Sequence, residues 1–324
     1  LISYPLMVII LLLISTVFYF GKISAVKKKM YVLINLLASG LLIYQSLTVL
    51  LTQKPAEFYL QMNHPIGLVN LVIDPLSAFF LLLIALLTAV LSFYSQAYIG
   101  HYKESEKPVR THYFMTNVFI ISMILVVMAQ NSIFFLIVWE LMSLSSFLLM
   151  TFESEKKEVR KACLSYFVWM HIAVVFLIFA FTKASLVSGH CVDFNDFRLM
   201  LPGNAQSDLI FILFFIGFGI KAGFVPFHSW LVKAHPSAPA NISGIMSALM
   251  LKIGLYGILR MLEISAINSF SVALLVTGTA LLSALWGIIY AVIQRDIKAI
   301  LAYSSIENIG IITLGIGVAM LGNY

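Results

Sequence analysis

Apolar stretches long enough to cross a lipid bilayer recur along this chain, and they limit its fold more than any other feature. The 324 residues are 61% hydrophobic and 10% charged, whereas a soluble domain carries roughly 25% charged residues. So few charges cannot cover the surface of a soluble protein of this size. The sequence therefore predicts an all-α, polytopic transmembrane helix bundle of about ten spans. The expected spans are residues 5–21, 30–51, 71–98, 113–130, 131–152, 163–183, 209–229, 239–260, 270–293 and 299–321.

Basic residues are distributed unequally between alternate loops, which sets the expected orientation. One set of loops holds Lys22, Lys27, Lys28, Lys29, Lys103, Lys107, Arg110, Lys156, Lys157, Arg160, Lys161, Lys233, Arg295 and Lys298. The opposite set holds Lys54, Lys183, Arg198 and Arg260. Because basic residues accumulate on the cytoplasmic side, both ends of the chain are expected outside. The net charge of +6 is therefore a membrane-topology signal and does not indicate nucleic-acid binding. A basic cluster follows the first apolar run, which favours a membrane span over a cleaved signal peptide.

Several ionisable residues fall inside the expected spans. Glu140 lies about nine residues into the fifth span, Lys221 about twelve into the seventh and Lys252 about thirteen into the eighth, so all three are near the midplane. His171 in the sixth span and Glu307 in the tenth lie at similar depth. A charge at that depth costs roughly 2.5–3.5 kcal/mol. These side chains are therefore expected to face the bundle interior, pair with one another or contact water.

The buried ionisable residues have two interpretations. A structural ion pair is the simpler one, since buried pairs can serve packing specificity alone. A proton relay is favoured by the number of titratable groups at one depth on successive spans. A lysine beside a carboxylate stays charged, and a lysine that loses its partner is driven toward neutrality by desolvation. We therefore expect Glu140, Lys221 and Lys252 to transfer protons, and for His171 and Glu307 both interpretations stay open.

The seventh span contains helix-breaking residues around its lysine. In "FFIGFGIKAGFVPFHSW", Lys221 is surrounded by Gly217, Gly219 and Gly223 and is followed by Pro226. Backbone groups freed by such residues are tolerated at membrane depth only against protein or water. The sequence predicts a broken helix with a hydrated cavity beside Lys221. Close helix packing by small residues is the alternative use of these glycines.

The order of the spans predicts an internal repeat. Spans four to eight form a five-helix set, and a second set beginning at span nine starts from the opposite side of the membrane. Such a pair is an inverted repeat, as in many transporters. We expect an N-terminal three-span segment at 1–112, a first five-helix proton-relay repeat at 113–263, and the start of a second, incomplete repeat at 264–324.

Metal and cofactor motifs are not found in the sequence. Cys163 and Cys191 lie at opposite ends of one expected span, so they could not pair, and their spacing is no metal motif. There is no cysteine cluster and no Gly-rich strand-to-helix motif for flavin, nicotinamide, iron–sulfur or nickel binding. No cofactor or metal is expected on this chain.

Three segments resemble a known family. These are "VWELMSLSSFLL", "KAGFVPFHSWLVKAHPSAPANISGIMSALMLKIGLYGILR" and "QRDIKAILAYSSIENIGII", and "VIDPLSAFFLLLI" fits as well. They resemble the proton-conducting antiporter-like subunits of respiratory complex I, multisubunit sodium/proton antiporters and group 4 hydrogenases, over about residues 70 to 321. "AYSSIENIGI" is most similar to the component B subunits of hydrogenase-4 and formate hydrogenlyase. Family motifs around the seventh-to-eighth connection match Pro226, His228, Trp230, Leu231, Ala234, His235, Ala238 and Pro239, whereas Val232 and Lys233 depart from a common proline-acidic pair.

The resemblance implies a proton-translocating membrane subunit with no redox centre of its own. The family's central glutamate–lysine pair carries over to Glu140 and Lys221, and its eighth-span relay residue to Lys252. The implied partners are other membrane subunits and a peripheral redox arm, in a bacterial-type inner membrane. Family members have about fourteen or more spans, so the chain resembles an N-terminal fragment or a split subunit. A cation/proton antiporter subunit moving sodium, and a non-pumping structural fragment, are the alternatives.

Overall fold

The structure is a computed structural model that describes residues 4–17, 25–61, 68–99 and 107–322. It contains two compact units. The first comprises residues 1–153 and 239–245, and the second comprises residues 154–238 and 246–324. Among the described residues, eight helices are long and apolar enough to cross a membrane. The prediction of an all-α polytopic helix bundle is confirmed.

The first unit is built mainly from helices that are long enough to cross a bilayer. Its elements are α1 (Tyr4–Val17), α2 (Ala25–Thr52), β1 (Ala56–Gln61), β2 (Leu68–Ile73), α3 (Pro75–Ile99), α4 (Lys107–Met128), α5 (Ser132–Met150), the 3₁₀ turn η1 (Thr151–Glu153) and α10 (Ala240–Ile245). In this unit α2 packs on α1 and α3, and α4 packs on α1, α3 and α5. The end of the expected first span lies partly outside the described residues.

A tight hairpin joins α4 and α5, as the sequence predicts. Helix α4 ends at Met128 and α5 begins at Ser132. The side chain of Asn131 accepts hydrogen bonds from the backbone N–H groups of Ile133 and Phe134, at 3.0 and 3.1 Å. This N-cap satisfies two of the donors that the first helical turn leaves without intrahelical partners. The hairpin therefore fixes the register between α4 and α5.

An antiparallel pair of short strands precedes α3, and the sequence did not predict it. Strands β1 and β2 pair from Ala56 opposite Ile73 to Gln61 opposite Leu68. The expected third span began at residue 71, but residues 71–73 belong to β2 and the helix starts at Pro75. The run "LVNLVIDPL" is apolar in either conformation, so hydropathy could not separate strand from helix. The proline at the first helical position marks the true start.

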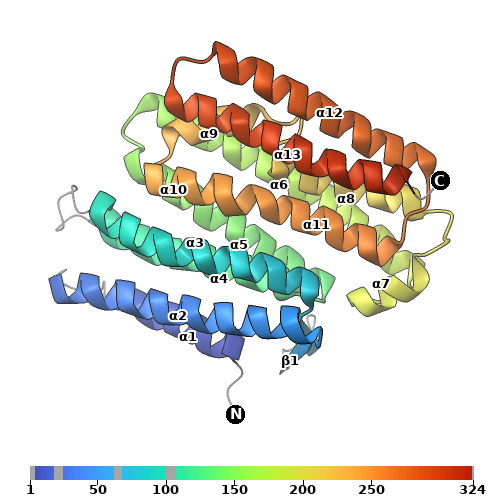
Figure 1. Ribbon diagram of the computed structural model, residues 1–324, viewed down its shortest axis with the longest axis horizontal. Coiled ribbons are helices and arrows are strands. Elements are labelled where there is room, and N and C mark those ends of the chain that lie inside the picture. The colour runs from blue at the N-terminus through green and yellow to red at the C-terminus, as the bar shows by residue number, and fades with distance from the viewer. Residues whose placement is uncertain (1–3, 18–24, 62–67, 100–106, 323–324) are drawn as a thin grey trace. The chain divides into compact units, whose positions relative to one another are not determined.

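The second unit contains long helices and several short ones. Its elements are α6 (Lys157–Val187), α7 (Phe194–Met200), α8 (Ser207–Ala222), α9 (Ser229–Ser237), the π-helix η2 (Met246–Met250), α11 (Leu251–Ser265), α12 (Phe270–Ile293) and α13 (Ile297–Leu321). Helix α8 packs on α6 and α11, and α9 packs on α6 and α13. Figure 1 shows the α12–α13 hairpin in orange to red.

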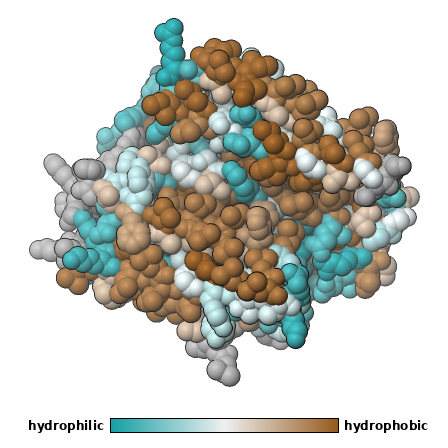
Figure 2. Space-filling model, viewed as in Figure 1, coloured by the Kyte–Doolittle hydropathy of each residue, from teal (hydrophilic) through white to brown (hydrophobic). Residues whose placement is uncertain are grey.

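Small residues bring α12 and α13 into close contact. A Cβ atom on Gly310 would lie 2.5 Å from the backbone nitrogen of Ala284, and one on Gly287 would lie 2.5 Å from that of Glu307. Helices can approach this closely only where a side chain is missing. On the outside of the same hairpin, large apolar residues such as Leu282, Val292 and Ile297 are exposed. Figure 2 shows how much of the viewed face is apolar, as expected of a surface that contacts lipid.

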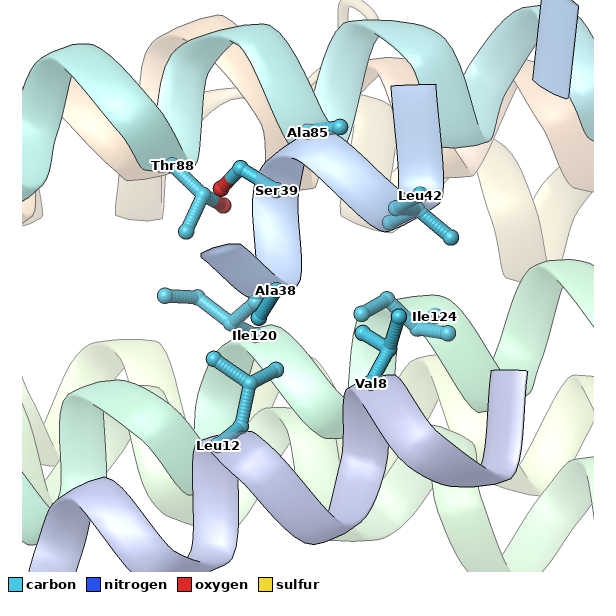
Figure 3. A pocket seen from close by; sticks show the side chains of 9 residues that line it. All are labelled: Val8, Leu12, Ala38, Ser39, Leu42, Ala85, Thr88, Ile120 and Ile124. Atoms are coloured by element: carbon cyan, nitrogen blue, oxygen red, sulfur yellow. The ribbon is translucent and has the colours of Figure 1, made fainter. Parts of the chain in front are cut away.

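A small void lies within the first unit between α1, α2, α3 and α4 (Figure 3). Its volume is about 10 Å³, near the lower limit for one water molecule. Ser39 and Thr88 supply its polar groups, and the other residues that line it are apolar. The void is therefore too small and too apolar for a ligand or for several waters.

Candidate functional site

Glu140 lies in the middle of α5, in the first unit. The residue is half-buried, and both of its carboxylate oxygens are shielded from solvent. Trp139 beside it is fully buried, and Ser143, one turn further on, is 3% exposed. The helix is continuous on both sides of the glutamate. The structure thus holds this carboxylate within a regular apolar helix, where the sequence predicted it.

Lys221 lies in the last turn of α8, in the second unit, and is 0% exposed. The helix ends where Gly223 takes a left-handed conformation with a φ of +85°, which favours glycine. Sixteen residues extend about 24 Å, less than a bilayer core of about 30 Å, so the seventh span is broken as predicted. The negative end of the helix dipole stabilises a positive charge in the last turn.

The segment after this break is held by specific hydrogen bonds. The indole Nε1 of Trp230 donates to the carbonyl oxygen of Ile220 at 2.9 Å. The backbone N–H of Val225 donates to the hydroxyl of Ser283 on α12 at 3.1 Å. These contacts satisfy backbone groups that the break frees, as a membrane environment requires. Sequence reasoning did not identify Ser283, because α12 contains several other hydroxyl residues and no local pattern distinguishes this one.

Lys252 follows directly after a π-helical segment. The helix that begins at Ala240 changes to a π-helix at Met246–Met250 before α11 resumes at Leu251. The half-buried Lys252 donates from Nζ to the carbonyl oxygen of Ser247 at 2.8 Å. Single π-helical turns inside α-helices occur frequently at functional sites. The sequence placed Lys252 inside the span but gave no indication of the π-helix.

The second unit brings Lys221 and Lys252 onto adjoining helices. A Cβ atom on Gly254 would lie 2.9 Å from the backbone nitrogen of Ala222. This close contact between α8 and α11 is therefore one residue from Lys221 and two residues from Lys252. Of the five candidate residues, Glu140 belongs to the first unit and the other four belong to the second.

His171 and Glu307 occupy less enclosed positions. His171 is half-buried on α6, with Nδ1 2.9 Å from the carbonyl oxygen of Phe167 and its ring 4.0 Å from the Phe167 ring. Its neighbour Ile172 is exposed, so the imidazole lies at the margin of the buried face. Glu307 is half-buried on α13, and its backbone contacts Gly287 of α12. For both residues, a structural role and a proton-relay role therefore stay open.

A group of basic side chains lies where α9, α11 and α13 meet in the second unit. His235 on α9 is 1% exposed. Burial, together with the positive charges of Lys252 and Lys298, lowers the pKa of His235 to about 4. Lys298 donates from Nζ to the carbonyl oxygens of Ala238 and Pro236, at 2.8 and 3.3 Å. His235 is therefore neutral at pH 7 and lies within the electrostatic reach of Lys252.

An open cavity adjoins this basic group. It has a volume of about 350 Å³ and is formed by the start of α6 and by α9. Its ionisable lining residues are Glu158, Lys161 and Lys233. All three belong to the loops rich in lysine and arginine or to adjacent helix ends, so the cavity opens on the side that the charge distribution predicts to be cytoplasmic.

Arg260 is a buried charge at a position where the sequence predicts a loop. It was assigned to a loop, but it lies within α11 and is 0% exposed. Its Nε donates to the hydroxyl of Tyr256 at 3.1 Å, and its Nη1 lies 2.9 Å from Glu263 Oε2. Arg198 on α7 reaches the other oxygen of Glu263 at 3.0 Å. Helix α11 ends at Ser265, five residues beyond the predicted span end, which explains the error.

The arrangement of long apolar helices, with a buried lysine at a broken helix, defines a class of multi-pass membrane proteins with ionisable groups inside the bundle. Residues 129–324 match the family described as "NADH:quinone oxidoreductase/Mrp antiporter, TM". The chain belongs to this family. The resemblance noted in the sequence is thereby confirmed.

Two relatives represent different branches of the family. Hydrogenase-4 component B of Escherichia coli K12 is 40% identical over 252 residues, which cover 77% of this chain and 37% of that protein. The putative antiporter subunit mnhA2 of Staphylococcus saprophyticus is 32% identical over 252 residues, which cover 76% of this chain and 30% of that protein. The chain therefore spans less than two fifths of the length of these relatives.

Two solved structures share the fold. One is of the membrane-bound sulfane sulfur reductase, an archaeal respiratory membrane complex, with a TM-score of 0.81 at 22% identity, covering 96% of this chain and 64% of that chain. The other is of the Mrp complex from Dietzia sp. DQ12-45-1b, with a TM-score of 0.80 at 22% identity, covering 97% of this chain and 34% of that chain. At this identity the comparison concerns the fold alone.

Proposed function

We propose that the chain is a proton-translocating membrane subunit of an ion-pumping oxidoreductase complex of the hydrogenase-4, formate hydrogenlyase or NADH dehydrogenase type. The observation that carries this proposal is the environment of Lys221. A lysine with no solvent exposure, placed at the end of a broken membrane helix, is energetically costly, and ionisable residues within membrane spans commonly mark ion or proton pathways. Membership of the family and the similarity to hydrogenase-4 component B support the same function.

The proposed mechanism moves protons between titratable side chains in the membrane interior. In the glutamate–lysine pair that the family resemblance implies, the charge of Glu140 would favour the ammonium form of Lys221. Neutralising Glu140 would then let desolvation drive the lysine toward neutrality. A proton released by Lys221 passes to Lys252 on the adjoining helix α11, with His171 and Glu307 as further members of the relay. Electron transfer in a partner subunit supplies the change of charge that starts the sequence.

The wider setting of the subunit forms part of the proposal. Other membrane subunits and a peripheral redox arm would hold the redox chemistry. The charge distribution of the loops favours a bacterial-type inner membrane with both described ends outside. Residues 113–263 would form the first five-helix relay repeat, 1–112 the preceding three-span segment and 264–324 the start of an inverted second repeat.

Proton uptake by inverted vesicles that contain the assembled complex tests this function. Glu140→Gln removes the titratable group and nearly preserves the side-chain volume. At matched complex levels, we expect proton uptake per electron to fall at least about tenfold, because a positioned proton-transfer group contributes that much or more. Glu155→Gln is the matched control, since Glu155 is exposed between helices. Unchanged uptake in the Glu140→Gln complex would refute the relay and favour a structural ion.

A cation/proton antiporter subunit is the second candidate, and the similarity to the putative antiporter subunit mnhA2 favours it. An antiporter needs the same buried residues but no redox partner. Vesicles that contain the complex would then exchange protons for sodium ions without an electron donor. Uptake that requires the donor and is insensitive to a sodium gradient would exclude this alternative.

A further inference from the structure

The first unit contains a buried histidine, His112, that is not one of the five candidate relay residues. His112 on α4 is 2% exposed. Its Nε2 lies 2.9 Å from the side-chain nitrogen of Asn241 on α10. The same Asn241 nitrogen lies 3.2 Å from the hydroxyl of Ser95 on α3. Three helices thus contribute one side chain each to a buried polar cluster, which we call the His112 cluster.

Packing alone does not explain an imidazole at this position. The His112 ring lies 5.0 Å from the ring of Phe152 and 6.1 Å from that of Tyr113, contacts that a phenylalanine would also make. Within the described part of the chain, His112 Nδ1 and Asn241 Oδ1 are buried and make no hydrogen bond. Buried polar atoms are almost always satisfied in native proteins. The unsatisfied Nδ1 atom of His112 therefore points to a functional use of the imidazole ring.

The α4–α5 hairpin determines the depth of the His112 cluster relative to Glu140. His112 precedes the last residue of α4 by sixteen positions, and Glu140 follows the first residue of α5 by eight. At 1.5 Å per residue, His112 lies about 12 Å further from the hairpin than Glu140 does, measured along the helices. It lies toward the end of α4 that carries Arg110 and the preceding basic loop.

Buried hydroxyl groups occupy the interval between these two depths. Ser143 and Ser146 follow Glu140 on α5 at intervals of about one turn, and they are 3% and 0% exposed. Thr116, one turn after His112 on α4, is 4% exposed. Each hydroxyl donates to a backbone carbonyl oxygen of its own helix and can accept a hydrogen bond in return, so polar groups are present at depths between the histidine and the carboxylate. Apolar residues would suffice if this interval served packing alone.

We infer that His112 is a proton-transfer residue between the basic-loop side of the first unit and Glu140, positioned by Asn241 and Ser95. This inference rests on the proposed function. The imidazole accepts a proton at one ring nitrogen and releases the proton of the other nitrogen toward Glu140, so its charge is unchanged after the transfer. It is then left in the alternate tautomer, and a ring flip resets it. Asn241 determines which nitrogen carries the proton at rest.

The other ionisable groups that the structure describes near His112 are unsuited to this role. Tyr113 lies beside it on α4, Tyr31 of α2 and Tyr98 of α3 belong to the adjoining aromatic cluster, and Arg110 lies two residues earlier on α4. Tyrosine and arginine give up a proton only far above neutral pH, whereas a neutral imidazole holds a proton on one ring nitrogen and can accept another on the second. Helix α10 contributes Asn241 and no ionisable residue. Among the described residues of this region, His112 is therefore the side chain that can accept one proton and release another without a net change of charge.

The test uses the assembled complex in inverted vesicles. His112→Phe keeps the ring contacts and removes both nitrogens, and Tyr31→Phe is the matched control because it removes a buried hydroxyl that donates to Asn117 in the same unit. We expect His112→Phe to lower proton uptake per assembled complex at least about tenfold and Tyr31→Phe to leave it within about twofold. Asn241→Ser retains the imidazole but changes its orienting partner. It should shift the midpoint of the pH dependence of proton uptake.

The outcomes separate this inference from the proposed function. If Glu140→Gln abolishes uptake while His112→Phe retains both uptake and its pH profile, His112 is a structural residue and the inference is overturned. If neither variant lowers uptake, the proposed function itself is wrong. Should the His112→Phe complex fail to accumulate, Asn241→Ser decides the question, since an unchanged pH midpoint in that variant contradicts the inference.

Discussion

Two cations are completely buried on adjoining helices of the second unit, and they differ in their surroundings. Arg260 on α11 is hydrogen-bonded to Tyr256 and paired with Glu263, and its guanidinium carbon lies 5.3 Å from the centre of the Tyr256 ring. Lys221 lies at the end of α8, beside a glycine break and a connecting segment braced by Ser283. The guanidinium of Arg260 is thus held by specific partners, whereas the ammonium of Lys221 lies at a break in its helix.

The choice of residue follows this difference. A guanidinium stays charged at any physiological pH and binds through a rigid planar fork. An ammonium on a flexible stem loses its proton when it is desolvated without a partner. Burial therefore does not distinguish a structural cation from a proton carrier. The ability to change charge does, and the two sites can be compared by exchanging their residues.

Exchange of the two residues has the largest expected effect. Lys221→Arg keeps a positive charge at the site but fixes it, since arginine does not deprotonate in proteins. We expect proton uptake per assembled complex to fall by about a hundredfold, with the complex still assembled. Arg260→Lys should lower the amount of complex and leave uptake per complex unchanged. Uptake by vesicles and complex abundance on native gels measure the two quantities.

Lys221→Met controls for the greater bulk of arginine in the first variant. It is close to lysine in volume and neutral, and it should lose uptake to the same extent. Retained pumping in Lys221→Arg would show that a permanent charge suffices at this site. The contrast between Lys221 and Arg260 would then have no functional meaning.

A third buried basic residue extends the comparison to a group that is neutral at rest. The pKa of His235 is lowered to about 4 by burial and by the charges of Lys252 and Lys298, whereas an unfolded histidine has a pKa of about 6.5. Between these values the unfolded state binds more protons, so stability falls as the pH drops from about 6.5 to 4. The loss is at most about 3 kcal/mol. Thermal dissociation of the detergent-solubilised complex at several pH values measures it.

His235→Gln should remove most of this pH dependence, because glutamine does not titrate. His190→Gln is the control, since His190 is exposed. An identical slope in wild type and His235→Gln would show that the charge on His235 is not coupled to folding.

Hydropathy and charge distribution were sufficient to predict much of the fold. The expected spans at 270–293 and 299–321 agree closely with α12 and α13, because both helices are long, apolar and bounded by polar residues. The tight hairpin before Ser132 and the break after Lys221 were also predictable, since Asn131, Gly223 and Pro226 signal them locally. The candidate site residues stood out because a charge in a lipid-soluble stretch is rare.

The features that the sequence did not reveal depend on contacts between distant segments. The π-helix before Lys252 has no distinctive residue pattern, and its carbonyl at Ser247 becomes significant only through the lysine that it binds. His112 and Asn241 are far apart in the chain, so their hydrogen bond was invisible to any local reading. Arg260 was misplaced because a span end cannot be located to within a turn when apolar residues continue beyond it.

The smallest expected effect concerns the partner of Arg260. Glu263→Gln retains a hydrogen-bond acceptor but leaves the buried guanidinium without its anion. Removing one member of a buried pair costs roughly 3–5 kcal/mol, and the side chain of Glu263 is 46% exposed, which reduces the loss to about 2 kcal/mol through solvent screening. Thermal dissociation of the complex should therefore occur at lower temperature, while proton uptake per assembled complex stays the same.

Glu263 also pairs with Arg198, so Arg198→Gln separates the two contacts. This variant should lose less stability because Arg198 is itself 38% exposed. If Glu263→Gln instead reduced proton uptake without lowering stability, Arg260 would take part in charge movement as Lys221 does, and the distinction between a fixed and a titrating cation would not hold.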